Sequence, residues 1–254
     1  MLLVVASLAA PWIAPFDPTR QQLDEDLRRP TLEHPLGQDK LGRDQLSRVI
    51  YGARVSLQVG IATVVVTATI GVVVGAIAGY AGGAIDFWAM RIVDVLLAFP
   101  GILLAIAMSA VLGPSLRNVV IALGAIGWTG YARLVRGEVL ALKQREHVQA
   151  ALALGVPRGR VLARHILPLL AAPVVVQATF GMAAAIVAEA SLSFLGLGVQ
   201  PPTPSWGAMI NDGRTFLLVA PHLTLWPGLA IFTTVLGLNF LGDGLRDVLD
   251  VRAR

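Results

Sequence analysis

The chain has 254 residues, of which 56% are hydrophobic and 14% charged, whereas an ordinary soluble domain has about 25% charged residues. It contains no cysteine, which excludes disulfides, thiol catalysis and zinc sites built on cysteine. The formal charge of +4 does not require nucleic acid as a partner, because Arg and Lys collect in the cytoplasmic loops of membrane proteins.

Long uncharged segments dominate the chain, among them residues 55–85 and 215–242. A transmembrane helix needs about 20 consecutive apolar residues. A large soluble helical core, the alternative, would carry polar residues every turn or so on its outer face. We therefore predict an all-α, polytopic membrane protein with about six transmembrane helices. The predicted spans are residues 1–15, 56–79, 93–113, 116–136, 170–195 and 222–243.

The first apolar stretch, residues 1–15, is short for a span. It has no basic region before the apolar run, as a signal peptide would, so we interpret it as a first transmembrane helix whose beginning is missing or whose start codon is assigned late. A polar segment, residues 16–55, follows. Apolar residues recur near helical spacing at its end, with arginines between them, which predicts a short amphipathic helix leading into the second span.

The orientation of the chain is predicted from its charges. An even number of spans places both termini on one side of the membrane, and the densest basic cluster, within residues 133–164, lies between the fourth and fifth spans. Because short cytoplasmic loops are enriched in Lys and Arg, we expect this loop and both termini to be cytoplasmic.

Three glycines, Gly71, Gly75 and Gly79, recur at every fourth position of the second span. Small residues at this spacing let two helix backbones approach closely in lipid. The general frequency of glycine in membrane helices explains one such residue better than three in register. We therefore predict that this face is a helix-packing interface, within the bundle or between subunits.

The sequence carries none of the common catalytic motifs. Neither lysine follows a glycine, so there is no G-x-x-x-x-G-K-[ST] phosphate loop. The sequence also has no G-x-S-x-G or H-E-x-x-H pattern, and its four histidines are scattered rather than closely spaced as metal ligands usually are. We expect a non-catalytic chain without a metal site or cofactor of its own.

Glu189 falls late in the fifth predicted span, shortly before Phe194. Charges at membrane depth are costly and usually face a bundle interior or a water-filled path. One interpretation makes Glu189, with Phe194, part of a pathway or gate. The other places Glu189 near the headgroups, hydrogen-bonded to Ser191, Ser193 or the backbone.

Residues 138–168 form a basic, helix-prone loop inside this apolar chain. Gly155 can take the left-handed conformation that ends a helix, and Pro157 suits the first position of the next one. Two short helices are therefore predicted to meet at a tight corner, followed by Arg158 and further arginines. Ala150, Ala151 and Ala153 are predicted to form a small-residue surface for a close partner. A solvated basic loop that only fixes topology, the alternative, would need no glycine corner.

The segments "QAALALG" and "HILP" in this loop resemble the cytoplasmic coupling loop of permease subunits of binding-protein-dependent ABC importers. Gln149 stands where that family usually has Glu, and His165 occupies the usual Ile position. The resemblance implies that this loop couples to an ATPase. The residues it assigns to the coupling are Glu146, Gln149, Ala150, Ala151, Gly155, Pro157, Arg158, Leu167 and Pro168.

Other segments extend the resemblance over most of the chain, including "DVLLAFPGILLAIA" and "EASLSFLGLGVQPPTPSWGAMINDGR". They look like the dipeptide, oligopeptide and nickel branch, second-permease type. The resemblance implies an importer core domain over residues 56–254 and a multi-pass location in the bacterial cytoplasmic (inner) membrane. It further implies a sister permease, two subunits that bind ATP and Mg, and a periplasmic or lipid-anchored solute-binding protein, with lipid around the spans.

The solute stays open between dipeptides, longer peptides, nickel chelates and glutathione-like molecules. A stand-alone secondary transporter or channel is the alternative function. It would work without ATPase subunits and predicts ionisable residues or broken helices at the membrane midplane.

Overall fold

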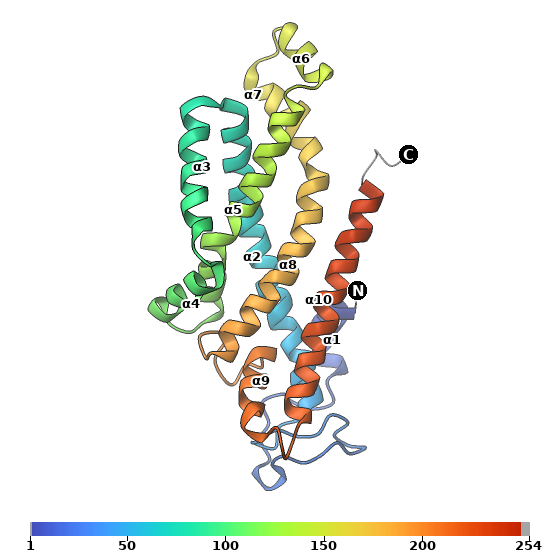
Figure 1. The fold of residues 1–254 in the computed structure, drawn as a ribbon. Helices are drawn as coiled ribbons and strands as arrows, with labels where there is room; N and C mark the ends of the chain where they lie inside the picture. Colours follow the sequence, from blue (N-terminus) through green and yellow to red (C-terminus); the bar gives the residue numbers. More distant parts are fainter. Residues whose placement is uncertain (1, 250–254) are drawn as a thin grey trace.

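The computed structural model describes residues 2–249, which fold almost entirely into helices arranged as an elongated bundle (Figure 1). Helices α6 and α7 lie at one end of the bundle, hereafter the α6 end. The loops that precede α2 lie with α9 at the opposite end, hereafter the α9 end. The helices are α1 (Leu2–Ile13), α2 (Gln45–Ala81), α3 (Gly83–Ala98), α4 (Gly101–Leu112), α5 (Leu116–Leu142), α6 (Glu146–Ala153), α7 (Arg158–Val161), α8 (Ala171–Phe194), α9 (Trp206–Gly213) and α10 (His222–Leu249).

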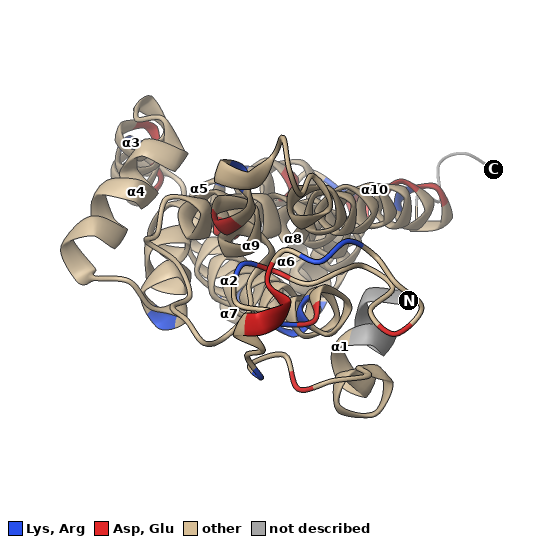
Figure 2. Ribbon diagram, turned by 90° about the horizontal axis from the view of Figure 1, so that it is seen from below, with Lys and Arg blue, Asp and Glu red and all other residues tan. Residues whose placement is uncertain are grey.

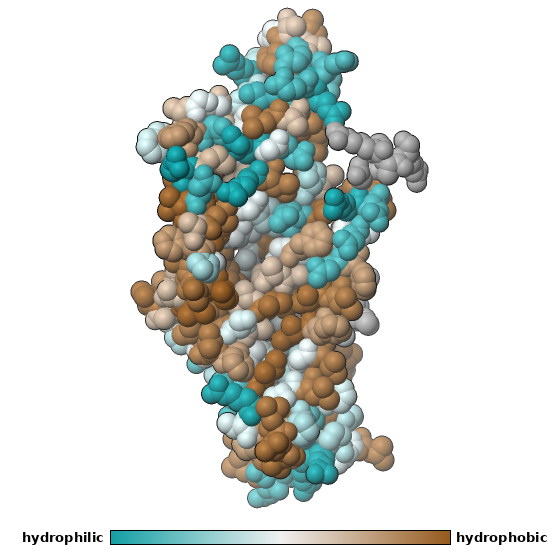
Figure 3. All heavy atoms as spheres, viewed as in Figure 1, coloured by the Kyte–Doolittle hydropathy of each residue, from teal (hydrophilic) through white to brown (hydrophobic). Residues whose placement is uncertain are grey.

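Four helical segments of the described chain are long and apolar enough to cross a membrane: α2, α5, the run from Arg158 through α8, and α10. The count rises to five if the bent pair α3 and α4 is one span. Apolar side chains cover the middle of the face drawn in Figure 3, whereas hydrophilic residues gather toward the two ends. This pattern matches a bundle surrounded by lipid at mid-height, as expected for the predicted all-α polytopic fold.

The predicted span over residues 93–113 is not one continuous helix. The chain instead forms α3 and α4, which are bent by 85° relative to each other. Pro100 causes the break, because proline disfavours the helical region for the residue before it, and Phe99 is accordingly extended at φ −90° and ψ 138°. Helix α3 also begins earlier than predicted, at a corner where Gly82 and Gly83 both have positive φ.

Helix α2 has 37 residues, which corresponds to a length of about 55 Å and exceeds the hydrocarbon thickness of a bilayer. The predicted short amphipathic helix is not a separate element, because its residues from Gln45 onward form the first turns of α2. Asp44 caps this helix by accepting hydrogen bonds from the backbone N–H of Ser47 at 2.7 Å and from its hydroxyl. His34 is paired with the same carboxylate, its Nδ1 2.8 Å from Oδ1.

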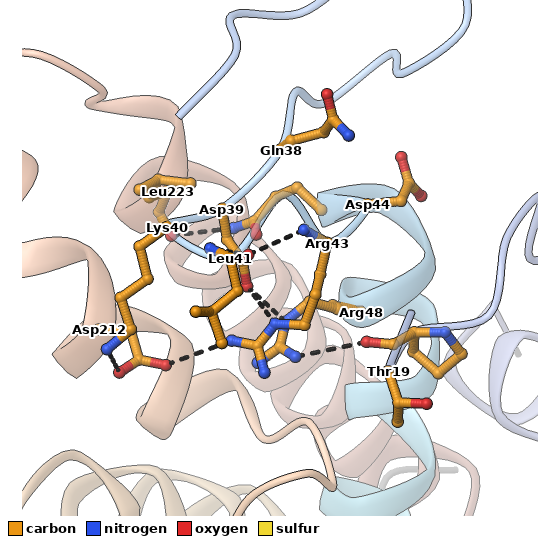
Figure 4. A network of polar contacts seen from close by, with 12 residues as sticks. Thr19, Gln38, Asp39, Lys40, Leu41, Arg43, Asp44, Arg48, Asp212 and Leu223 are labelled. Atoms are coloured by element: carbon orange, nitrogen blue, oxygen red, sulfur yellow. Dashed lines mark hydrogen bonds and ion pairs between the residues drawn. The ribbon is translucent and has the colours of Figure 1, made fainter. Parts of the chain in front are cut away.

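An ion-pair network holds the polar segment before α2 against α9 (Figure 4). The Asp39 carboxylate accepts from Arg43 Nε at 2.7 Å and lies 3.4 Å from Arg48 Nε, and Lys40 reaches Asp212 of α9 at 2.7 Å. Both arginines are buried, so they do not form the exposed face of an amphipathic helix. Seen from the α9 end, both acidic and basic positions lie on this side of the molecule (Figure 2), and the ion pairs above join several of them.

Helices α2 and α5 pack along each other, and the three predicted packing glycines lie on the contact face. A Cβ at Gly71 would lie 2.4 Å from Tyr131 Cβ, and a Cβ at Gly75 would lie 2.4 Å from the carbonyl oxygen of Ala132. A Cβ at Gly79 would lie 3.0 Å from the carbonyl oxygen of Arg136. The interface that these glycines form is therefore within the chain, between α2 and α5.

Two ion pairs attach α3 to α5. Arg136 forms a bidentate pair with Asp86, and Arg133 Nη2 lies 2.7 Å from Asp94 Oδ1. Helix α10 ends on the same side of the bundle as α6 (Figure 1). The two termini that we predict to be cytoplasmic, residue 1 and residues 250–254, lie outside the described residues.

Candidate functional site at the 146–168 loop

Helix α6 is attached to the bundle by one apolar face. Val148 is fully buried and Ala151 is nearly so, and both join a hydrophobic cluster at the α6 end of the bundle. The other buried members of this cluster are Ala76 of α2, Val135 and Val139 of α5, and Val161, Ile166 and Leu170 before α8. This cluster packs α6 on the end of the bundle, together with residues of α2, α5 and the segment that leads into α8.

The opposite face of α6 is exposed and carries Glu146, Gln149, Ala150 and Ala153. The predicted small-residue surface is therefore wrong in one position, since Ala151 points into the hydrophobic cluster. Val148 and Ala151 are three residues apart and share the buried side of the helix. The exposed surface combines small alanines with polar side chains at its edge.

The corner after α6 is a Schellman motif. Gly155 has φ 78°, its N–H donates to the carbonyl of Leu152 at 3.0 Å, and the N–H of Val156 donates to the carbonyl of Ala151 at 3.1 Å. These two bonds satisfy carbonyls that the helix end would otherwise leave unpaired. Glycine takes the left-handed conformation without a steric penalty, so the sequence itself specifies this turn.

Pro157 is the N-cap of α7, one position before the first helical residue where we predicted it. Its carbonyl accepts from the N–H of Arg160 at 2.8 Å, which starts the next helical turn. Arg158, Arg160 and Arg164 are all exposed beyond the corner. The loop therefore presents a basic surface next to the exposed face of α6.

The segment that enters α8 is irregular. Residues Leu162–Ile166 form a π-helical turn and Leu167–Leu170 a 3-10 turn. Pro168 accounts for the change, because proline lacks an N–H and its ring clashes with the carbonyl four residues earlier in an α-helix. Leu167 packs against the hydrophobic cluster below α6, whereas Pro168 is exposed.

Polar contacts that the sequence analysis missed attach the loop to α2 and α5. The Gln149 amide nitrogen donates to the carbonyl of Lys143 at 2.7 Å. Lys143 Nζ donates to the carbonyl of Tyr80 at 2.9 Å and lies 5.4 Å from the centroid of the Tyr80 ring. A lysine at the carboxyl end of α2 also complements the negative end of the helix dipole. No local sequence pattern signals a contact between residues 80 and 143.

Glu189 lies beside the N-cap of α9 and is fully buried. Its Oε1 accepts from the hydroxyl of Ser193 at 2.6 Å and from that of Ser205 at 3.1 Å. Ser205 in turn caps α9 by accepting from the N–H of Ala208. Ser191 instead donates to the backbone carbonyl of Val187. Glu189 thus links the end of α8 to the start of α9, and its role in a gate stays a prediction.

Phe194 is the last residue of α8 and is not part of the hydrogen-bonded group of Glu189, Ser193 and Ser205. Together with Ile210 of α9 and Ile231 of α10 it lines a shallow apolar depression. The guanidinium carbon of Arg214 lies 5.6 Å from the centroid of its ring, a cation–π contact. The role of Phe194 in a pathway or gate also stays a prediction.

Comparison with known proteins agrees with this geometry. The family described as "Binding-protein-dependent transport system inner membrane component" matches residues 71–254. The chain is 49% identical over 255 aligned residues to the "Glutathione transport system permease protein GsiD" of Escherichia coli O1:K1 / APEC. The same identity is found for the GsiD proteins of Escherichia coli strain UTI89 and Shigella boydii serotype 4 strain Sb227. Each alignment covers 100% of this chain and 84% of the relative.

These matches confirm the resemblance seen in the sequence and a multi-pass location in the inner membrane. They also confirm a permease role that is not catalytic and that depends on a solute-binding protein. They favour this role over a stand-alone secondary transporter, the alternative that we considered. The chain belongs to the inner-membrane components of binding-protein-dependent transport systems, the permease subunits of ABC importers.

Proposed function

We propose that this chain forms half of the transmembrane pathway for a small peptide, such as glutathione or a related oligopeptide, in an ATP-driven importer. The observation that carries the choice of solute is the 49% identity, over the whole of this chain, to permeases named for glutathione transport. A second permease supplies the other half of the pathway. Two ATPase subunits hold ATP and Mg, and a solute-binding protein delivers the peptide at the α9 end.

The 146–168 loop is the proposed contact with an ATPase subunit. Its exposed face carries Gln149, Ala150 and Ala153, and its buried face joins α2, α5 and α8 in one cluster. Closure of the ATPase pair on ATP would move α6 as a rigid piece, since the Schellman corner at Gly155 and the Gln149–Lys143 hydrogen bond hold its orientation. The three long helices would then pivot between two states, and allosteric coupling requires contacts that differ between such states.

Reconstitution of the whole complex tests the proposed solute. The complex is purified in mild detergent with its companion chains, placed in liposomes containing ATP, and supplied with the solute-binding protein and radiolabelled glutathione or trialanine. We expect ATP-dependent uptake of at least one of these peptides and no uptake by a complex whose ATPase subunits cannot hydrolyse ATP. Uptake of a nickel chelate with neither peptide transported would contradict the choice of solute, and nucleotide-independent uptake would contradict the coupling.

A further inference from the structure

A cavity of about 300 Å³ lies between α2, α4, α5 and α8. It sits at mid-height, because Thr63 is the middle residue of α2 and Gly181 and Ile126 lie near the middles of α8 and α5. The 13 lining residues include no charged side chain. This volume is at the lower end for a ligand pocket, as expected for one half of a site shared by two subunits.

The wall of the cavity combines small residues with neutral hydrogen-bonding groups. Gly101, Gly127 and Ala184 are exposed at its mouth, so the cavity opens on the surface of the chain, where small residues permit close approach of another helix bundle. Thr63, Thr67, Tyr131 and Gln177 supply hydroxyl and amide groups. No other kind of polar side chain lines this cavity.

Two of these groups have hydrogen-bonding capacity to spare. The Thr63 hydroxyl is buried and has no hydrogen-bond partner among residues 2–249, although a buried polar atom without a partner is costly. Tyr131 is also buried, and its hydroxyl is 3.4 Å from the carbonyl of Gln177, a long and weak contact. By contrast, the Thr67 hydroxyl is satisfied by the carbonyl of Thr63 at 2.8 Å.

Two glycines leave the space that Tyr131 and Thr67 occupy at the wall of the cavity. A Cβ at Gly181 would lie 2.5 Å from Tyr131 Oη. The Tyr131 hydroxyl therefore reaches from α5 to α8 only because residue 181 has no side chain. A Cβ at Gly127 would likewise lie 2.8 Å from Thr67 Cγ2. The Gly71–Gly79 interface ends next to Tyr131, which also lines the cavity.

We propose that this cavity is the chain's part of the solute path and that Thr63, Tyr131 and Gln177 bind the uncharged amide backbone of a peptide solute. The proposal rests on the proposed function. An amide group both donates and accepts, as these three side chains do. Because the cavity has no charge of its own, it recognises the backbone common to peptides rather than the charge of any one side chain.

Cysteine labelling tests whether solute reaches the cavity, since the chain has no cysteine of its own. Ala184→Cys is introduced at the mouth, and Leu236→Cys, on the exposed surface of α10, is the matched control. Only a thiol in contact with water forms the reactive thiolate. In the full complex, we expect a small thiol reagent to label Ala184→Cys and not Leu236→Cys. Trialanine delivered by the binding protein to an ATP-trapped complex should remove most of this labelling.

Hydrogen bonding by the wall is tested with Thr63→Val and Tyr131→Phe, which keep the shape of each side chain. The amount of radiolabelled trialanine retained by the ATP-trapped complex should fall roughly 2- to 12-fold in each variant. Thr233→Val, on the exposed surface of α10, should retain the wild-type amount. Tripeptides with acidic, basic and neutral side chains should all protect Ala184→Cys.

Several results would overturn this assignment. Ala184→Cys that is not labelled in a transporting complex, or that is labelled equally with and without trialanine, would exclude the cavity from the path. Unchanged retention of trialanine in both Thr63→Val and Tyr131→Phe would exclude hydrogen bonding by these side chains. Protection of Ala184→Cys only by tripeptides of one charge, whether acidic, basic or neutral, would exclude recognition of the backbone. Failure of the proposed function is distinguishable, because the wild-type complex would then not transport peptide at all.

Discussion

The Gln149 amide nitrogen lies 2.7 Å from the carbonyl oxygen of Lys143, so the exposed face of α6 is hydrogen-bonded to the end of α5. A glutamate, which the resembling family usually has at this position, would present two acceptor oxygens to the same carbonyl and could not form this bond when ionised. The amide of Gln149 therefore adds a polar attachment to the apolar packing of Val148 and Ala151 in this chain.

Replacing the Gln149 side chain should modestly weaken the coupling of ATP hydrolysis to solute uptake. We expect Gln149→Ala and Gln149→Glu to lower ATP-dependent uptake per complex by roughly 2- to 12-fold, because an ordinary hydrogen bond contributes about 0.5–1.5 kcal/mol net. Uptake in proteoliposomes measures this effect, with Gln144→Ala, also exposed, as the control. Higher uptake by Gln149→Glu than by the wild type would contradict a role for the Gln149–Lys143 contact.

The corner at Gly155 should not tolerate a branched side chain. Its φ of 78° is in the left-handed region, where a non-glycine residue costs about 1–3 kcal/mol, although the space around its Cβ position is open. Gly155→Val should keep normal protein levels in the membrane while ATP hydrolysis is no longer accompanied by uptake. Gly159→Val is the control, because Gly159 has equally open surroundings without a positive φ. Equal uptake by the two variants would show that the corner is unimportant.

The close contact between α2 and α5 predicts a difference in stability between two glycine variants. Gly75→Ala would place a methyl group 2.4 Å from the carbonyl of Ala132, and such overpacking costs about 1–3 kcal/mol. Gly130→Ala, in an open part of α5, should be neutral or slightly stabilising. Thermal unfolding of the two variants in the same detergent measures the difference, and equal midpoints would contradict the packing described here.

Two variants of Glu189 distinguish its alternative roles. Glu189→Ala removes the acceptor of the Ser193 and Ser205 hydroxyls, and buried groups left without partners cost about 1–3 kcal/mol each, so the unfolding temperature should fall. Glu189→Gln keeps an acceptor oxygen and should retain both stability and uptake. Loss of uptake in Glu189→Gln with normal stability would instead support a gate that needs the carboxylate charge.

Local signals in the sequence predicted part of this structure. The Schellman corner follows from Gly155 alone, because few other residues adopt the conformation that it requires. The glycine spacing on α2 likewise predicted a packing face. At Pro100 the signal for a break was present, but the uninterrupted hydrophobicity around it indicated a single span. Hydropathy shows how long an apolar stretch is, but it does not show where the helix bends.

Contacts between distant residues could not be predicted from one sequence. Asp86 and Arg136 are 50 positions apart, and no periodicity within either helix indicates that they meet. The inward position of Ala151 depends on which side of a short helix meets α5 and α8, and an alanine fits either side. The cavity between α2, α4, α5 and α8 was missed for the same reason, since its polar groups come from three separate helices.

Crosslinking at α6 tests the central claim, that an ATPase subunit engages this loop. Ala153→Cys places one thiol on the exposed face of α6 in a chain without other cysteines. A reagent that joins this thiol to nearby lysines should capture the ATPase subunit of the purified complex, with a yield that changes on addition of ATP. Leu218→Cys, fully exposed in the turn between α9 and α10, should capture no ATPase. Capture of the ATPase through Leu218→Cys and not through Ala153→Cys would contradict the account.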